Sequence, residues 1–267
     1  MFKNFKNILF VSMSLATFVL LFSAFTYAKF DVENTLLKPG AIPTSEDAKC
    51  VTYLKSMFKT WNQSSKTDGV VYSKYIISST LNGNSTSNNI SSKSEIESIS
   101  FGNKSRVYSK EMIVLRDEKY TISILPQKKI VFWTNSIKSK VSLSTAQAQI
   151  SKMQDSLLSI REKIVCEAVK GKKNSKVVHV YLKYAKGYAG QLTKLSYYIN
   201  TATKTLQKLT MNYTPESEFK KISYEFIAQN YNYKKVDMKT PVKQLVFTSN
   251  NTLLQKYAGF KLIDNRK

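Results

Sequence analysis

Residues 112–133 read MIVLRDEKYTISILPQKKIVFW, with three apolar and β-branched runs only a few positions apart. Short turns at Asp117-Glu118 and Pro126-Gln127 separate these runs. We predict strands here over residues 106–115, 119–125 and 129–135. Parallel neighbours would need long crossover connections, so the tight spacing predicts an antiparallel meander.

Strand-like composition extends to both sides of this stretch. Upstream, we predict strands over residues 70–79 and 96–101, separated by a polar loop at residues 81–94. Downstream, we predict five more strands, at residues 163–170, 176–183, 191–201, 205–213 and 220–231. In the last two runs apolar and polar residues alternate, which indicates one buried face and one face in water.

Two segments have helical periodicity instead. The first covers residues 45–63, with Thr44 or Ser45 as its N-cap and apolar side chains at steps of three and four. The second covers residues 145–163 and carries a narrower apolar stripe. We expect both stripes to pack against the sheet.

A long antiparallel meander with only two helices excludes a doubly wound fold. Two alternatives remain. One is a two-sheet sandwich, and the other is a strongly curved sheet that forms an incomplete β-barrel covered by the helices. We favour the second, an α+β fold whose helices and sheet enclose a hydrophobic cavity for a hydrocarbon ligand, although a filled core is the simpler alternative. The expected cavity and lid residues are Leu54, Met57, Phe58, Trp61, Ile122, Met153, Leu157, Ile160, Met211, Tyr224 and Phe226.

The first 28 residues have the order of an export signal, with Lys3 and Lys6 before an apolar run and small residues before a cut after Ala28. An uncleaved membrane anchor is the alternative, because the apolar run is long for a cleaved signal. We expect an extended lead-in at residues 29–43 and a single domain at residues 44–267. A bacterial chain of this kind would work in the periplasm.

The amino-acid composition limits which metal, cofactor and catalytic sites the chain can form. The formal net charge is +23, and one histidine, two cysteines and eight glycines leave little material for a metal site or a glycine-rich phosphate cradle. We therefore expect no metal, no cofactor and no enzyme. In an oxidising compartment Cys50 and Cys166 could form a disulfide, but two separate buried thiols explain them equally well.

The order of these elements resembles the Lol carriers, LolA and LolB, and their bacterial relatives. The resemblance lies in the export signal, the helix EDAKCVTYLKSMFKTW, the strand pair of residues 112–133, the mid-chain helix and the terminal GFKLIDNRK. It implies a monomeric periplasmic carrier or sensor that holds the acyl chains of a lipid or lipoprotein beneath a helical lid. It further implies transport toward the outer membrane, delivery partners in both membranes, and a lid closed by an arginine, for which Arg106 is the nearest counterpart.

The many lysines would draw such a carrier toward anionic membrane surfaces. They also suit a rival function, a secreted module that binds polyanions or glycans through a lysine- and tyrosine-rich surface such as YNYKKVDMK at residues 231–239. A thiol enzyme is the remaining alternative. If residues 163–170 pair with residues 176–183 so that Cys166 faces His179, the two could act as nucleophile and base, whereas a slip of one residue separates them.

Overall fold

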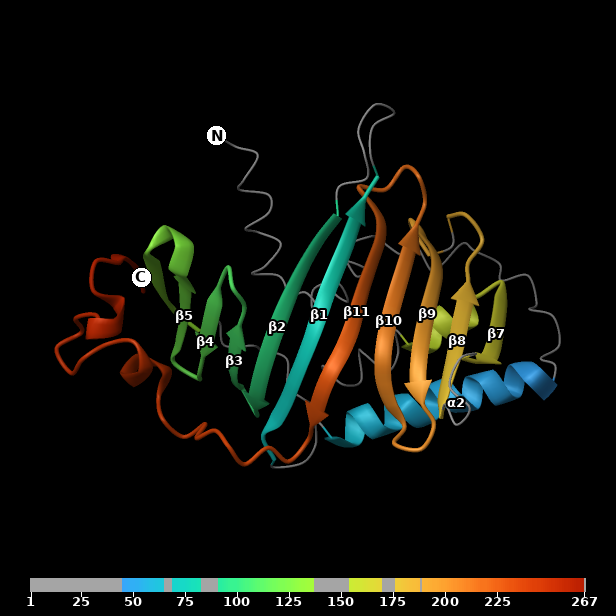
Figure 1. The fold of residues 1–267 in the computed structure, drawn as a ribbon, viewed down its shortest axis with the longest axis horizontal. Helices are drawn as coiled ribbons and strands as arrows, with labels where there is room; N and C mark the ends of the chain where they lie inside the picture. The colour runs from blue at the N-terminus through green and yellow to red at the C-terminus, as the bar shows by residue number, and fades with distance from the viewer. Residues whose placement is uncertain are drawn as a thin grey trace.

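A computed structural model describes residues 45–64, 69–82, 91–136, 154–169, 176–187 and 189–266 (Figure 1). The predicted export signal and lead-in lie outside these residues, as do most of the predicted loop at residues 81–94 and Met153. The side chain of Trp61 also lies outside the description.

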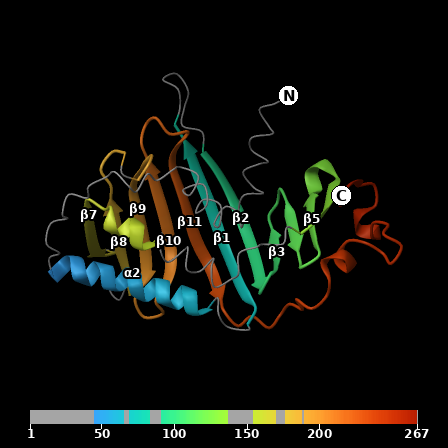
Figure 2. The same ribbon diagram turned by 180° about the vertical axis from the view of Figure 1, so that it is seen from behind.

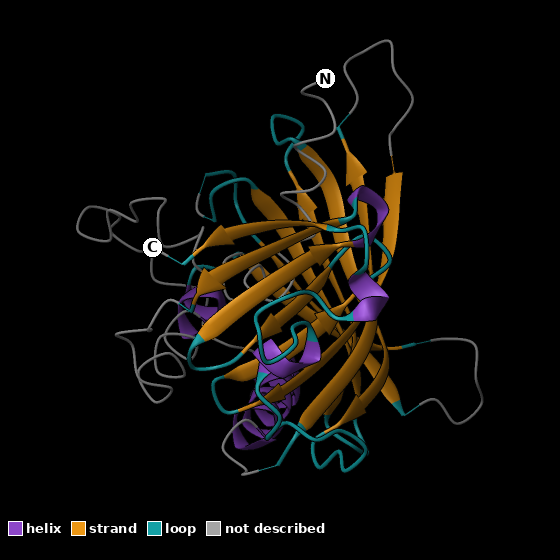
Figure 3. Cartoon of the chain, turned by 90° about the vertical axis from the view of Figure 1, so that its left-hand side faces the viewer, coloured by secondary structure: helices purple, strands orange, loops and turns teal. Residues whose placement is uncertain are grey.

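Strands make up most of the described chain (Figure 3). Helix α2, Ser45–Ser64, comes first, and residues 154–159 form a further helical segment. The strands of the first half are β1 (Val71–Leu81), β2 (Ser91–Phe101), β3 (Lys104–Tyr108), β4 (Ile113–Arg116), β5 (Tyr120–Leu125) and β6 (Ile130–Asn135). Those of the second half are β7 (Lys163–Ala168), β8 (Val177–Lys183), β9 (Leu192–Asn200), β10 (Thr205–Tyr213), β11 (Phe219–Asn230) and β12 (Lys261–Asn265). Short 3-10 helices are η1 (Pro126–Lys128), η2 (Val242–Leu245) and η3 (Gln255–Tyr257).

All these strands belong to one 12-stranded sheet, in the order β12-β6-β5-β4-β3-β2-β1-β11-β10-β9-β8-β7. Strands β1–β6 form one antiparallel meander and β7–β11 form a second (Figure 1). The two meanders join because β11 pairs with β1, over a register that runs from Tyr72 opposite Asn230 to Leu81 opposite Phe219. Strand β12 is parallel to β6, so the sheet is largely, not entirely, antiparallel.

The predicted mostly antiparallel sheet with few helices is confirmed, but its predicted strong curvature is not. The sheet is open, with β12 and β7 as its edges, and it is not strongly curled. The physical reason is that the sheet does not wrap around one interior, because it buries apolar side chains on both of its faces.

The first face, here called the helix face, carries α2. Its buried residues come from α2, the residue 154–159 segment, strands β1–β3, strands β7–β11 and the β8–β9 connection: Cys50, Leu54, Met57, Tyr75, Ile96, Val107, Leu158, Ile164, Val180, Leu182, Tyr184, Ala189, Leu192, Leu195, Tyr197, Ile199, Leu206, Leu209, Met211, Ile222 and Tyr224. Figure 2 shows α2 crossing the second meander, with β2–β5 beyond its end.

The opposite face, here called the outer face, buries a second cluster at the other end of the sheet. This outer-face cluster consists of Leu115, Ile122, Ile124, Val131, Trp133, Val242, Val246 and Phe247. The strand registers place the two clusters on different faces. Val107 lies opposite Ser98 and so shares the helix face with Ile96, whereas its neighbour Arg106 lies opposite Leu115.

Residues that follow β11 cover the outer face of β4–β6. Phe247 stacks on Trp133 with ring centroids 4.2 Å apart, and the Arg266 guanidinium lies 3.4 Å from the same ring. The buried Asp117 carboxylate ties this cover to the sheet. It accepts hydrogen bonds from the backbone N–H groups of Lys119 and Tyr120 at 2.8 and 2.9 Å, and from that of Val242 at 2.9 Å.

Local hydrogen bonds explain where strand boundaries differ from those predicted. The run at residues 106–115 is divided between β3 and β4 by a turn in which the Ser109 hydroxyl accepts from the backbone N–H groups of Glu111 and Met112. Residues 91–94, predicted to be loop, belong to β2 because they pair with β1, and the Ser79 and Ser92 hydroxyls lie 2.7 Å apart.

Candidate functional site

Helix α2 forms as the sequence predicts and presents a narrow apolar stripe to the sheet. Glu46 and Asp47 lie in its first turn, where the helix dipole favours negative charge. Cys50, Leu54 and Met57 are at most 1% exposed, and their spacing of four and three places them on one side of the helix. Three lysines project into solvent instead: Lys49, Lys55 and Lys59. The helix is therefore held by a few apolar contacts along one line.

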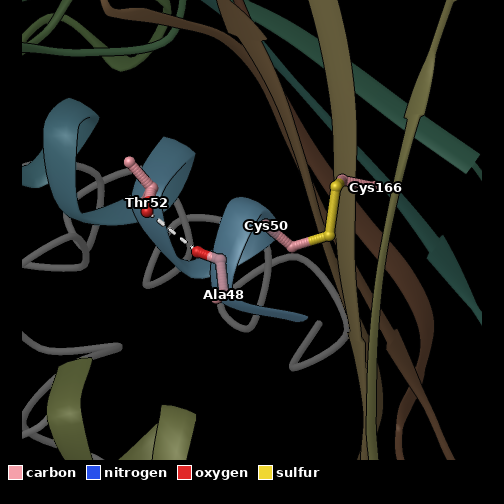
Figure 4. The surroundings of a disulfide bond; sticks show 4 residues. All are labelled: Ala48, Cys50, Thr52 and Cys166. Atoms are coloured by element: carbon pink, nitrogen blue, oxygen red, sulfur yellow. Dashed lines mark hydrogen bonds between the residues drawn. A yellow bond between two sulfur atoms is a disulfide. The ribbon is translucent and has the colours of Figure 1, made fainter. Parts of the chain in front are cut away.

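A disulfide fastens this helix to the sheet. Cys50 in the second turn of α2 is bonded to Cys166 on the edge strand β7, with Cα atoms 5.3 Å apart (Figure 4). In the same turn the Thr52 hydroxyl donates to the Ala48 carbonyl at 2.8 Å. The sequence left open whether Cys50 and Cys166 are disulfide-bonded or are two separate thiols, and the structure has the disulfide. Because such bonds persist in oxidising compartments, the disulfide indicates an extracytoplasmic protein.

The alternative in which Cys166 faces His179 as a thiol enzyme is wrong, because the β7–β8 hairpin has a different register. Cys166 lies opposite Val180, and His179 lies opposite Glu167. This slip of one residue puts the sulfur and the imidazole on opposite faces, and the sulfur is consumed in the disulfide. His179 instead stacks on Tyr198 at 4.4 Å between centroids, and its Nδ1 lies 3.0 Å from Glu167 Oε1.

Aromatic rings line the helix face beneath and beside α2. Phe58 meets Tyr197 edge-on at 5.9 Å, and Tyr75 lies 5.7 Å from Phe226, both between ring centroids. Tyr224 is buried in the same cluster. Three of these five rings are tyrosines, and the aromatic rings present large apolar areas that suit contact with hydrocarbon.

Burial on this face raises the pKa of several tyrosines. It raises the pKa of Tyr75 and of Tyr213 to about 12, from an ordinary 10.0. The pKa values of Tyr184, Tyr197 and Tyr224 are also raised, and burial is the main cause in each. The Tyr184 hydroxyl is buried without a hydrogen-bond partner among the described residues. The helix face is therefore a region where charge is strongly disfavoured.

Most of the predicted cavity and lid residues do come together on the helix face. Those that lie in its cluster or pack against it are Leu54, Met57, Phe58, Leu157, Ile160, Met211, Tyr224 and Phe226. Whether they enclose a ligand cavity stays a prediction. A solvent-open cleft lies elsewhere, between Tyr120, Asn135, Asp264 and Arg266, and its polar lining does not suit hydrocarbon.

Two predicted residues lie on the other face. Ile122 is fully buried in the outer-face cluster, opposite Leu115 and Trp133. Arg106 also points to the outer face, where its Nη2 donates to the Asp237 carbonyl at 2.6 Å. The structure therefore does not bring Ile122 and Arg106 together with the other predicted cavity and lid residues. On β3, alternation places Val107 toward α2 and Arg106 away from it.

The sequence prediction missed much of the helix face. Leu195, Tyr197 and Ile199 on β9 are buried there and alternate with the polar Lys194, Ser196 and Tyr198. This alternation was the available signal. Among the described residues, no helix is both long and apolar enough to cross a membrane, and no group of three or more His, Cys, Asp or Glu side chains could hold a metal ion.

Reduction of the disulfide should loosen α2 specifically. The bond closes a loop over a sequence separation of 116, for which a cross-link typically contributes about 2–5 kcal/mol to the free energy of unfolding. We expect the Cys50→Ala/Cys166→Ala variant to lose stability in that range in urea titrations, with faster amide exchange in α2 than in β1. A reductant should destabilise the parent protein and leave the double variant unchanged; equal effects on both would contradict this role.

The buried tyrosines predict a stability loss at alkaline pH. In the folded state Tyr75 and Tyr213 keep their protons up to a pKa of about 12, whereas in the unfolded chain they titrate near 10. Between these values the native state binds more protons, so the free energy of unfolding should fall as pH rises from about 10 to 12. Absorbance titration at 295 nm should show that some tyrosines ionise only near a pH of about 12. If every tyrosine titrated near pH 10 while the protein stayed folded, the predicted loss of stability at alkaline pH would be refuted.

No family model matches the chain, and no curated protein matches it. A solved structure of an uncharacterized conserved protein from Thermus thermophilus covers 81% of this chain and 99% of its own, at 6% identity and a TM-score of 0.39. MucB covers 78% of this chain and 66% of its own, at 11% identity and a TM-score of 0.38. A LolA superfamily protein from Nitrosomonas europaea covers 69% and 95%, at 9% identity and a TM-score of 0.30. A putative outer membrane lipoprotein-sorting protein domain from Vibrio parahaemolyticus covers 70% of this chain and 96% of its own, at 9% identity and a TM-score of 0.28.

Proposed function

We propose that this protein is a periplasmic carrier or sensor that binds the acyl chains of a lipid or lipoprotein against the helix face. One observation carries the proposal. The helix face buries apolar side chains from β1–β3 and from β7–β11, whereas α2 packs mainly against β7, β8 and β10. The apolar surface therefore extends beyond the strands that α2 contacts, and partly buried residues such as Ile77 and Phe226 belong to it.

The energetics of such binding are favourable. Burial of one methylene group contributes about 0.8 kcal/mol, so an acyl chain that buries about a dozen of them gains roughly 10 kcal/mol before the costs of association. The lining is adaptable, because Met57 and Met211 have flexible, polarizable side chains. Raised tyrosine pKa values mark the same surface as one from which water and charge are excluded.

The disulfide gives α2 the character of a tethered lid. It fixes the second turn of the helix to the edge strand β7. The later turns, which carry Met57 and Phe58, are held only by side-chain contacts. An acyl chain could therefore displace the end of α2 that lies nearer β1 while the tethered end stays on the sheet.

The remaining parts of the proposal concern location and partners. Residues 1–28 would direct export and be removed, and residues 44–267 would act as one monomeric domain. Lysines would favour transient contact with anionic membranes during transport toward the outer membrane. The solved complex of MucA and MucB shows that a structure similar to this chain has a protein partner, and we propose delivery partners at the inner and outer membranes.

Ligand capture can be tested directly. Protein purified from a periplasmic extract with its disulfide intact should carry adducts of acylated mass in native mass spectrometry, and it should bind a fluorescent fatty acid after the native ligand is removed. Repeated absence of adducts together with failure to bind the fatty acid would contradict the proposal.

Adjacent isoleucines on β1 offer a matched pair of variants. Ile77 lies opposite Tyr224 on the helix face, whereas Ile76 lies opposite Glu225 on the outer face. Because a buried isoleucine contributes about 1.5–3 kcal/mol, Ile77→Gln should weaken fatty-acid binding about tenfold or more. Ile76→Gln should leave the dissociation constant nearly unchanged. Equal losses in the two variants, both checked for folding by circular dichroism, would place the site elsewhere.

A further inference from the structure

The outer face of the second meander carries a straight row of lysines. Lys163 on β7 lies opposite Lys183 on β8, and Lys183 lies opposite Lys194 on β9. Asn212 on β10 comes next, and it lies opposite Lys221 on β11. We call these four lysines the lysine row. Because neighbouring strands are about 4.8 Å apart, the row runs about 19 Å across five strands.

The registers place this row on the outer face. The neighbours of its members along each strand, Ile164, Leu182, Leu195 and Ile222, are all buried on the helix face. Lys163, Lys183 and Lys221 are exposed to solvent, and Lys194 is half-buried with its Nζ 4.0 Å from the Tyr181 ring centroid. Figure 1 views the sheet from this face, with α2 behind it.

The lysine row places like charges on neighbouring strands, whereas another row on the same surface pairs opposite charges. Like charges directly opposite one another on neighbouring strands are destabilising. Another row, four residues along β7, pairs its charges: Glu167 lies beside His179, and Lys208 lies 3.8 Å from Glu225. Among the described residues, no carboxylate lies within ion-pair distance of any lysine in the row. An external anion would relieve this repulsion between the lysines of the row.

Between these two rows lies a third with polar and aromatic groups. It runs from Tyr181 through Ser196, Thr210 and Ser223, each opposite the next. Ser196 and Thr210 are buried, so within this third row the partly exposed Tyr181 and Ser223 are the residues that can offer a hydroxyl group beside the lysines. The lysines are point charges without the forked geometry of arginine, so they favour repeated single contacts along a polymer.

We propose that the lysine row binds a linear anionic polymer with phosphate groups along a polyol backbone. The strip is long and narrow, which fits an extended chain laid across the strands. A membrane surface fits it less well. The large apolar side chain that the described residues expose most, Ile227, lies six residues along β11 from Lys221, about 20 Å away.

The test compares two variants of equal charge. In one, Lys163, Lys183, Lys194 and Lys221 are changed to glutamine. In the control, the exposed Lys55, Lys110, Lys119 and Lys261, which lie outside the row, are changed to glutamine. The probe is fluorescently labelled poly(glycerol phosphate), with binding followed by anisotropy at about 0.15 M salt. A parallel assay uses vesicles of phosphatidylglycerol and phosphatidylcholine.

We expect the row variant to bind the polymer at least about tenfold more weakly and with a shallower salt dependence, while the control changes less than about twofold. The row variant should melt no lower than the parent, because it loses like-charge repulsion. Equal losses in both variants would show that net charge alone acts and would overturn the proposal. It would also be overturned if the parent ignored the polymer, or if the row mattered only for vesicles.

Discussion

The pairing of β11 with β1 is the contact on which the rest of this structure depends. Each meander alone would end in an unpaired central edge, and only this long-range antiparallel pair merges them into one sheet. The two strands are 11 and 12 residues long, and their side chains set which face each half presents. Tyr75, Tyr224 and Phe226 meet across this join, so the apolar helix face is continuous from one meander to the other.

Burial on both faces explains why the sheet stays open. The helix face is apolar mainly in the second meander and the central strands, whereas the outer face is apolar over β4–β6. A sheet that curls around one interior needs its apolar side chains on one concave face. Here the residues after β11, held through Asp117 and the Trp133 ring, cover one region, and α2 covers another. The proposed acyl-chain site is the part of the helix face that extends beyond α2.

Periodicity predicted the elements well, because α2 and most strands bury the side chains that their own sequence marks as apolar. Faces were harder. Whether Arg106 or Val107 points toward α2 depends on the registers of β2, β3 and β4, and no local pattern in residues 104–108 reveals it. The slip of one residue that separates Cys166 from His179 has the same origin. The disulfide was undetermined for a related reason, since Cys50 and Cys166 approach only through the packing of α2 on β7.

The proposed function requires that acyl chains lie on the helix face. Photo-crosslinking with a diazirine-bearing fatty acid, followed by peptide mass spectrometry of the disulfide-intact protein, tests it most directly. We expect label on peptides that contain Met57, Tyr224 or Phe226, and we expect unlabelled fatty acid to compete for this label. Label concentrated on the outer-face cluster around Trp133 and Phe247, or no label that competes, would contradict it.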